Sequence, residues 1–340
     1  LHPQLPTPPQ QAPANMLLRL RFCTRRHLSS KSLFVPSPPS LTSTTSSTST
    51  FIKDADLLST FLQKHSPSIA VLTGAGISTS AGIPCYRGEL GSYSKGHEPV
   101  QHNEFLHDPD KRKRFWARSL RGYEYFSKRQ PTTTHQLLAQ LEENQSIQGI
   151  ITQNVDRLHH QAGSKHVVEL HGRGDTVGCV EDNCTFSEPR KDFTLRMKEL
   201  NEKWLMKHNL KQKITNIDND GEDIRADGDA HLSLDDFSDF IVPSCPKCHD
   251  GILMPELTFF GGSIANEVKD NATKIINDAN ALLILGTSAS TYSAFRLVRL
   301  ASKDEKPIFM VNIGETRVDD MVDVKLEWVV DEMMKKAISC

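Results

Sequence analysis

The chain has 340 residues, a formal net charge of -2 and a pI near 6.7, so its charge gives no reason to expect nucleic acid or an anionic membrane surface as a partner. A hydrophobic fraction of 37% suffices for one large core and a smaller second domain. The sequence contains no run of about 20 apolar residues that could cross a membrane. We therefore expect neither nucleic acid nor membrane as a partner.

The N-terminal segment has an unusual composition. Residues 1–53 contain no Asp or Glu, and the stretch from Met16 onward is rich in Arg and Ser, which is typical of an organelle transit peptide. Arg19 and Arg21 interrupt its apolar stretch, which argues against a secretory signal. We predict that residues 1–50 form a disordered leader for the mitochondrial matrix, with a plastid as the alternative, and that Met16 is the true start. A merely disordered Pro/Ser/Thr tail is the other interpretation.

Helices and short apolar strands alternate after this leader. An amphipathic helix at Phe51–Lys64 is followed by a buried strand at Ile69–Thr73 and a glycine loop that opens a new helix. Such alternation predicts an α/β fold with a doubly wound parallel sheet. The other expected helices are 110–126, 131–144 and 293–302, and the other expected strands are 149–152, 166–170, 281–286 and 307–312.

The periodicity weakens between Asp175 and Gly251. We predict that residues 51–174 and 252–334 form a discontinuous nucleotide-binding domain and that residues 175–251 form a smaller inserted domain with an acidic insertion. The acidic run 216–227 partly matches a calcium-binding loop, but it ends on Asp rather than Glu, and a solvated loop is the better interpretation.

Two close pairs of cysteines lie in this inserted segment. Cys179 and Cys184 have four residues between them, and Cys245 and Cys248 have two. Thiolates at such spacings form tetrahedral zinc sites, and an all-thiolate zinc is normally structural. We predict one structural zinc ion on these four cysteines. Cysteine pairs without a metal, inert or redox-active, are the alternative.

Polar residues and glycines follow the ends of several predicted strands. Ligands of doubly wound sheets bind at the carboxyl ends of the strands, so we expect these segments to converge on one crevice. The Gly74-Ala75-Gly76 turn suits a phosphate, yet Thr79 stands where a dehydrogenase fingerprint has its third glycine, and a plain tight turn is the alternative. The converging segments are Gly74–Ser78, Gln153–Asp156, His171, Gly286–Ser288 and Asn312–Gly314.

Two of these segments carry groups suited to catalysis. A histidine such as His171 has a pKa range that suits proton abstraction near neutral pH, although a lone His is more often a surface or hydrogen-bonded residue. Gln153, Asn154 and Asp156 can read a carboxamide or hold ribose hydroxyls. The alternative for this segment is a turn in which Asn154 caps a helix.

Taken in order, "GAGIS", "GIPCYRG", "TQNVDRLH", "ELHG", the cysteine pairs, "MPELTFFGG", "GTSAS" and "VNIGETR" resemble the sirtuin family of NAD-dependent protein deacylases. The resemblance covers Phe51–Val330 and is greatest to the mitochondrial class II branch, judging by Tyr86, "RFWAR" and "VNIGETRVDD". It implies a Rossmann-like NAD-binding domain with a small zinc-binding domain.

The resemblance also implies a role for each matching residue. In the cofactor site, Gly74, Ala75, Gly76, Ile77 and Ser78 would hold the NAD pyrophosphate, and Ile83, Tyr86 and Arg87 would form a mobile loop over it. Gln153, Asn154, Val155 and Asp156 would serve nicotinamide and its ribose. Gly286, Thr287, Ser288, Asn312, Ile313 and Gly314 would hold the adenosine half, with Val330 as a last adenine contact. Thr258–Gly261 would pair with a substrate peptide as an added strand.

The implied reaction consumes NAD as a co-substrate. The acyl oxygen of a modified lysine attacks C1′ of the nicotinamide ribose, nicotinamide leaves, and His171, with Asn154 and Asp156 in the same site, activates a ribose hydroxyl that attacks the resulting imidate. The acyl group ends on ADP-ribose. Two alternatives remain open: transfer of ADP-ribose to protein from the same site, and a catalytically weakened zinc-containing interaction module.

Three positions depart from the family pattern. Cys85 replaces the usual Asp of the cofactor loop, Gly262 replaces an acid, and the first cysteine pair is two residues wider than usual. Loss of the carboxylate at position 85 predicts weaker NAD binding or slower turnover. Tyr93 with Gly96, where an acid-selective relative has Arg, argues against a preference for succinyl-lysine.

Overall fold

The computed structural model describes residues 44–86, 99–210, 228–230, 232, 234 and 236–339, with side chains from residue 48 onward. All of these residues belong to one compact unit, Leu33–Cys340. Most of the predicted leader and the acidic run 216–227 lie outside the described residues, as do Arg87, Tyr93 and Gly96. Within the described part, no helix has the length and apolarity needed to span a bilayer.

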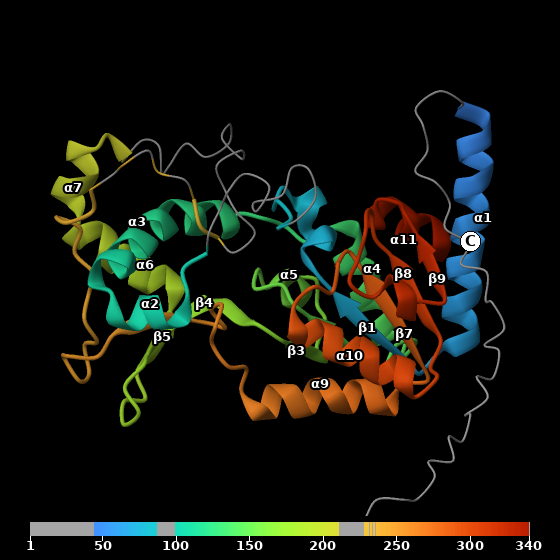
Figure 1. Ribbon diagram of the computed structural model, residues 1–340. Helices are drawn as coiled ribbons and strands as arrows, with labels where there is room; N and C mark the ends of the chain where they lie inside the picture. The colour runs from blue at the N-terminus through green and yellow to red at the C-terminus, as the bar shows by residue number, and fades with distance from the viewer. Residues whose placement is uncertain are drawn as a thin grey trace, which may run out of the picture. The chain divides into compact units, whose positions relative to one another are not determined.

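Six short strands form a parallel sheet in the order β3-β2-β1-β7-β8-β9 (Figure 1). Every residue of β1, β2, β7 and β8 is buried, as expected for parallel strands that are covered on both faces. The five predicted strands are confirmed. Strand β9 has only three residues and was not predicted. The strands are β1 (Ile69–Thr73), β2 (Gly149–Thr152), β3 (Val167–Glu169), β7 (Ala281–Leu285), β8 (Ile308–Val311) and β9 (Val324–Leu326).

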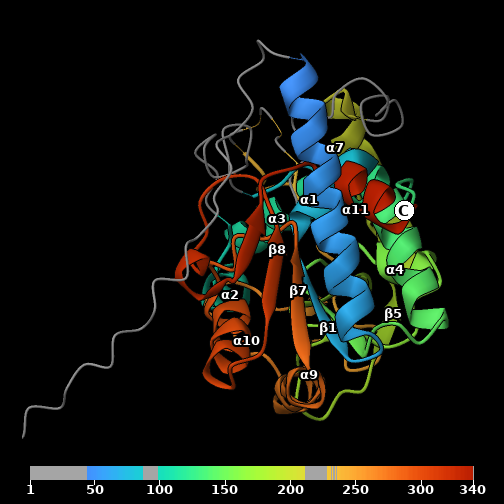
Figure 2. The same ribbon diagram turned by 90° about the vertical axis from the view of Figure 1, so that its right-hand side faces the viewer.

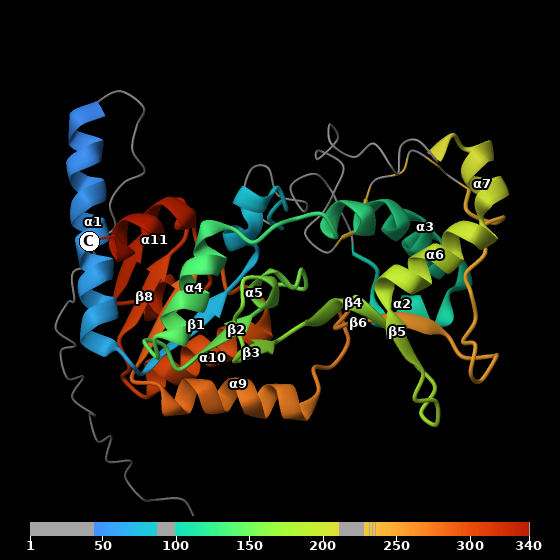
Figure 3. The same ribbon diagram turned by 180° about the vertical axis from the view of Figure 1, so that it is seen from behind.

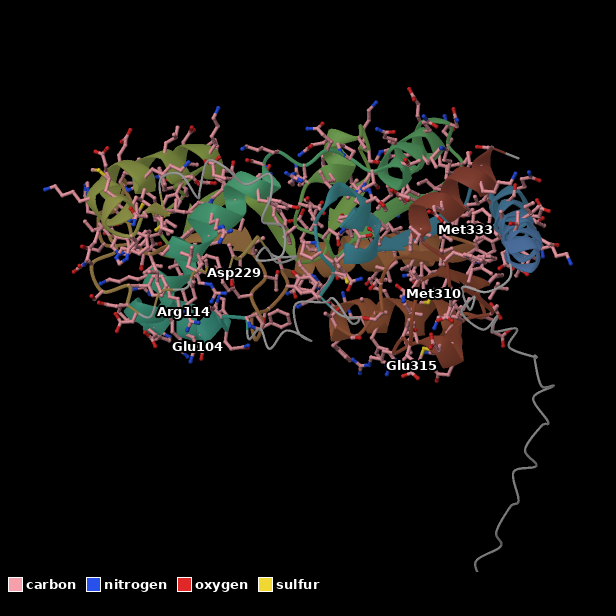
Figure 4. All side chains as sticks on the ribbon, turned by 90° about the horizontal axis from the view of Figure 1, so that it is seen from above. Glu104, Arg114, Asp229, Met310, Glu315 and Met333 are labelled. Carbon is pink, nitrogen blue, oxygen red and sulfur yellow. The ribbon has the colours of Figure 1, made fainter. Side chains whose placement is uncertain are left out.

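Helices pack on both faces of this sheet (Figure 2). Alternation along β1 sends Ile69 and Val71 into one hydrophobic cluster and Ala70 and Leu72 into the other. The first cluster includes α1 (Thr44–His65), α4 (Thr133–Glu143) and α11 (Val330–Ile338), and the second includes α9 (Asn266–Asp278) and α10 (Tyr292–Lys303). Met333 of α11 and Met310 of β8, both labelled in Figure 4, belong to the first and the second cluster respectively. The predicted doubly wound α/β architecture is confirmed.

The first helix begins earlier than predicted. Helix α1 starts at Thr44, so residues 44–50 of the predicted disordered leader are helical. Residue 50 is therefore not a structural boundary, because the helical segment continues through it.

A second, antiparallel sheet lies in the cysteine-containing segment (Figure 3). Its strands have the order β5-β4-β6, with β4 (Gly172–Cys179), β5 (Ser187–Pro189) and β6 (Leu253–Leu257), and α6 (Arg190–Leu200) and α7 (Glu202–Lys207) follow β5. A third hydrophobic cluster joins these elements to α2 (His102–His107) and α3 (Pro109–Phe126) through Phe105, Trp116, Phe193 and Leu253. We call the described residues of 99–126 and 172–257 the cysteine lobe, and the remaining described residues the sheet lobe. The division predicted at 175–251 thus omits α2 and α3, which contribute to the same core.

Candidate active site

The glycine turn after β1 is fixed against the end of β7. The N–H of Gly74 donates to the carbonyl of Leu285 at 3.2 Å, and that of Gly76 donates to the carbonyl of Gly286 at 2.8 Å. A Cβ at Gly76 would lie 2.7 Å from the Cα of Gly286, so a larger residue cannot pack here. The chain then enters a short 3₁₀-helix, η1 (Ala75–Ala81), and not the regular helix that the sequence predicts.

Side chains after β2 bind this turn from the other side. Asn154 Nδ2 donates to the carbonyl of Gly74 and to Ser78 Oγ, both at 3.1 Å, and Ser78 Oγ donates to Asp156 Oδ2 at 2.7 Å. Gln153 Nε2 donates to Thr287 Oγ1 at 2.8 Å. The carboxyl ends of β1, β2 and β7 therefore meet at the same end of the sheet, as the sequence predicts. Asn154 is not a helix cap, because its side chain makes these contacts and residue 157 occupies the N-cap position of the following helix.

Asp156 is a half-buried carboxylate with a fixed orientation. Its Oδ1 accepts from the N–H of Leu158 at 3.0 Å, while Oδ2 accepts from Ser78. Burial raises the pKa of Asp156, against the opposing effect of these two hydrogen bonds. The carboxylate is thus held in place at the edge where the strands end.

His171 presents one ring nitrogen as a base. Its Nδ1 lies 3.1 Å from the carbonyl oxygen of Gln153, and a carbonyl only accepts, so Nδ1 carries the proton of the neutral ring. Nε2 therefore has a lone pair, which faces the hydroxyl of Ser293 at 2.8 Å. Burial lowers the pKa of His171, in opposition to the hydrogen bond with Gln153. A neutral imidazole with an unprotonated Nε2 is the form that abstracts a proton.

The sequence prediction missed two hydroxyl residues in this network. Thr291 Oγ1 donates to Gln153 Oε1 at 3.2 Å, and Ser293 Oγ lies 3.1 Å from Thr291 Oγ1. Thr291 also caps α10, since its side chain accepts from the N–H of Ala294. Both residues follow the predicted segment Gly286–Ser288, and this run of hydroxyl residues after a strand end was the signal that could have found them.

The other predicted cofactor residues differ in their solvent exposure. Ile83 and Val330 are buried, Tyr86, Val155 and Ser288 are half-buried, and Ile313 is 64% exposed. Asn312–Gly314 follow β8, the neighbour of β7, where the N–H of Asn312 donates to the carbonyl of Leu326. The fit to a dinucleotide rests on the chemistry of the groups that meet where the strands end: a glycine turn that allows close approach, two amides, a carboxylate and a base.

The four cysteines meet in the cysteine lobe. Their Sγ atoms all lie within 4.8 Å of one another, with 3.7 Å between Cys179 and Cys248 and 3.6 Å between Cys184 and Cys245. Zn–S bonds of about 2.3 Å in a tetrahedron place sulfurs about 3.8 Å apart, so these residues fit one zinc ion. A Cβ at Gly251 would lie 2.3 Å from Cys179 Sγ, which explains the glycine there.

One thiol of this cluster has a lowered pKa. Burial alone would raise the pKa of Cys245, but backbone N–H groups of Cys248 and Lys247 outweigh it and bring the pKa to about 7. Zinc binds thiolates, so this local environment also favours the metal.

The segment expected to pair with a peptide joins the two lobes. The N–H of Thr258 donates to the carbonyl of His171, and the carbonyl of Phe260 accepts from the N–H of His102, both at 2.8 Å. Two residues of this region replace an acid of the family pattern. Cys85 is half-buried, and the N–H of Gly262 donates to the carbonyl of Phe259 in a turn.

Known proteins resemble this chain along most of its length. The Sir2 family model matches residues 74–293. The chain is 40% identical over 274 residues to the NAD-dependent protein deacylase Sirt4 of Drosophila melanogaster, a match that covers 79% of this chain and 82% of that protein. It is 41% identical over 286 residues to the NAD-dependent protein deacylase SRT2 of Arabidopsis thaliana, covering 82% and 74% respectively.

Solved structures give the same result. A structure described as the basis for the mechanism and regulation of Sir2 enzymes superposes with a TM-score of 0.64 at 26% identity, covering 84% of this chain and 97% of the other. A Sir2 complex with a p53 peptide and NAD⁺ gives 0.58 at 27% identity, covering 82% and 94%. Family model, relatives and fold agree with the motifs from which the resemblance was drawn, and this chain belongs to the Sir2 family, the sirtuins.

Proposed function

We propose that this protein is an NAD-dependent protein lysine deacylase, which moves an acyl group from lysine to ADP-ribose and releases nicotinamide. One observation carries the proposal: a half-buried, neutral His171 presents Nε2 beside the network of Gln153, Asn154 and Asp156. The names of the relatives, NAD-dependent deacylases and deacetylases, support it. A Sir2 structure with a deacetylated peptide and 3′-O-acetyl-ADP-ribose supports the acceptor.

The base in this proposal is Nε2 of His171. It takes a proton from a ribose hydroxyl, which then attacks the activated acyl carbon, and Nδ1 keeps its hydrogen bond to the carbonyl of Gln153 throughout. Burial supports this role, because the lowered pKa of His171 keeps the ring unprotonated near neutral pH. Asn154 and Asp156 act beside it as fixed polar groups for nicotinamide and its ribose.

The remaining site residues take binding roles. Gly74–Ser78 lie against the pyrophosphate, where glycines allow its close approach, with Ile83, Tyr86 and Arg87 in the loop over the cofactor. Gly286–Ser288, Asn312–Gly314 and Val330 hold the adenosine half, and Thr258–Gly261 pair with the acyl-lysine peptide. The zinc ion on the four cysteines is structural, because all four ligand positions are thiolates and the coordination is closed.

Product analysis tests the proposal. Incubation with NAD and acetyl-lysine peptides is expected to give nicotinamide, free lysine and O-acetyl-ADP-ribose in equal amounts. His171→Ala is expected to block the formation of free lysine and O-acetyl-ADP-ribose, because His171 acts after nicotinamide has left. A protein that gains ADP-ribose instead would establish the transferase alternative. Binding of NAD with no nicotinamide release on any acyl peptide would leave the interaction module as the function.

We further infer that the protein acts in the mitochondrial matrix. The support is the composition of residues 1–53, which lack acids and are rich in Arg and Ser. A fusion of residues 1–50 to a fluorescent reporter is expected to enter mitochondria. Entry into plastids would establish the alternative, and a diffuse reporter would contradict both.

A further inference from the structure

A buried threonine–histidine pair supports the start of the glycine turn, Gly74–Ser78. Thr73 is the last residue of β1 and directly precedes this turn. Its Oγ1 lies 3.0 Å from Nε2 of His159, which belongs to α5 (Leu158–Gln161). Both residues are at most 2% exposed, so water cannot take the place of either partner. The strand end from which the turn begins is therefore fixed to α5.

A second pair supports the middle of the same turn. Thr132 occupies the N-cap position of α4, and its Oγ1 donates to the carbonyl of Ile77 at 3.0 Å. The same oxygen lies 2.8 Å from Nδ1 of His135, in the first turn of α4. Both of these residues are buried as well. The turn is therefore connected to α4 through a carbonyl of its own backbone.

The two pairs form one cluster. The rings of His135 and His159 meet edge to face, with their centres 4.7 Å apart and an interplanar angle of 62°. We call Thr73, Thr132, His135 and His159 the threonine–histidine cluster. Helices α4 and α5 therefore support the turn as one packed unit.

The cluster acts through hydrogen bonds and not through charge. Burial lowers the pKa of His135 to about 4, and burial also lowers that of His159. The carboxylate of Asp331 acts on His135 in the opposite sense, but it accepts from the N–H and the hydroxyl of Thr134. Both rings are therefore neutral near pH 7. Removing the partner of either ring would leave a buried polar atom unsatisfied, which is costly.

The cluster binds the turn at points that the contacts described above do not reach. The N–H groups of Gly74 and Gly76 donate to carbonyls at the end of β7, and Asn154 binds the carbonyl of Gly74. None of these bonds involves the side chain of Thr73 or the carbonyl of Ile77. The turn is thus held by three separate parts of the sheet lobe, and the cluster is one of them.

We propose that the threonine–histidine cluster holds the glycine turn in the arrangement that receives NAD, so that its four members are positioning residues of the cofactor site. The inference rests on the proposed function, because that function assigns the turn to the pyrophosphate. A turn that keeps the binding arrangement for only part of the time binds NAD more weakly by that fraction. Loss of one pair should therefore raise the Kd and the KM for NAD while kcat changes little.

The experiment removes one hydroxyl at a time from the full chain. Thr73→Val and Thr132→Val keep the branched shape of the side chain and lose the hydrogen bond. We expect the Kd for NAD, measured by calorimetry, to rise by about three- to tenfold in each variant, the factor that corresponds to one buried hydrogen bond. The KM for NAD should rise with it, and kcat should stay within about twofold of wild type.

Conservative variants should rescue the affinity. Thr73→Ser and Thr132→Ser keep the hydroxyl and should restore most of the NAD affinity that the Val variants lose. His159→Gln keeps a polar group within reach of Thr73, so it should bind NAD more tightly than His159→Leu.

Thr134→Val is the matched control. Thr134 is a fully buried threonine of the same helix, but its hydroxyl donates to Asp331 and not to the glycine turn. The substitution should lower the free energy of unfolding in urea by as much as Thr132→Val does, and it should leave the Kd for NAD unchanged.

Three results would overturn the inference. They are an equal Kd for NAD in wild type and both Val variants, an equal loss of NAD affinity in Thr134→Val, and a fall in kcat with an unchanged Kd. The second result would indicate general destabilisation. NAD binding is measured without acyl peptide, so failure of the deacylase function, seen as bound NAD without nicotinamide release, is distinguishable from failure of the inference.

Discussion

The two lobes are stabilised in different ways. The sheet lobe packs alternate residues of its strands into two large hydrophobic clusters, and its contacts are distributed over six strands and the helices on both faces. The cysteine lobe has a short antiparallel sheet, a third cluster and four thiols that meet at one point. The catalytic groups proposed above come from the ends of sheet-lobe strands. We therefore expect substitutions of the cysteines to reduce folding stability. Substitutions at the carboxyl ends of the sheet-lobe strands should instead reduce catalytic activity.

The largest effect is expected at the cysteines. Cys245→Ser removes a buried ligand, and structural zinc contributes about 10 kcal/mol or more to the folding of small metal modules. We expect loss of zinc, measured by metal analysis, and proteolytic cleavage within the cysteine lobe while the sheet lobe stays protected. Cys85→Ser is the control and should keep its zinc. Retention of zinc and protease resistance by Cys245→Ser would show that the lobe does not depend on this cluster.

The next largest effect is expected at the sheet edge. His171→Ala removes the proposed base, and kcat for nicotinamide-coupled deacylation should fall by about 10²- to 10⁴-fold with NAD affinity nearly unchanged. Unfolding should remain as in wild type, because the change removes chemistry and not packing. His166→Ala, at an exposed histidine of the same lobe, should have wild-type activity. A His171→Ala enzyme with normal kcat would place the base elsewhere.

Stability below neutral pH depends on buried histidines of the sheet lobe. Burial lowers the pKa of His135 from 6.5 to about 4, and burial also lowers that of His159. Below pH 6.5 the unfolded chain binds protons that the folded state does not, so the free energy of unfolding falls as the pH drops. His135 accounts for about 2 kcal/mol of the fall in the free energy of unfolding between pH 7 and pH 5. Urea unfolding of His135→Gln should show a shallower pH dependence than wild type, and an equal slope would contradict this assignment.

A smaller effect is expected at Cys85. Restoring the carboxylate with Cys85→Asp adds hydrogen-bond acceptors beside the cofactor loop, and NAD affinity or turnover should rise by about two- to tenfold. Titration of NAD by calorimetry and the rate of nicotinamide release measure the two quantities. Unchanged values for both would show that this position does not limit the enzyme. Cys85→Ser separates the effect of the carboxylate from the effect of losing the thiol.

The smallest effect is expected at Ser293. Its hydroxyl donates to Nε2 of neutral His171, and such a bond favours the neutral ring. Ser293→Ala should therefore raise the pKa of His171 and move the acid limb of the pH profile of kcat/KM to higher pH, by less than about one unit. The same shift is not expected for Ser290→Ala, which lacks contact with His171. A profile that does not move would show that the bond is absent in the working enzyme.

The strands and site residues of the sheet lobe could be predicted from the sequence because the patterns that indicate them are local. Five short apolar strands each end in or precede a glycine or a polar residue. The rule that ligands bind at strand ends therefore predicts that Asn154, Asp156 and His171 lie together. The cysteine spacing likewise predicted four thiols at one point. The antiparallel sheet and the contribution of α2 and α3 to the third cluster were not predicted, because contacts such as that between Trp116 and Phe193 join segments that share no sequence period.

The sequence by itself determined the fold class, the four cysteines that cluster and the identity of the candidate base, because periodicity, spacing and strand-end position are properties of the chain. Only the tertiary structure decided which nitrogen of His171 is free, since that depends on the carbonyl of Gln153 and the hydroxyl of Ser293 meeting the ring from two different loops. It also decided that Thr73 meets His159 and that Thr132 reaches the carbonyl of Ile77. Hydrogen bonding depends on distance in space, and no spacing in the sequence reports it.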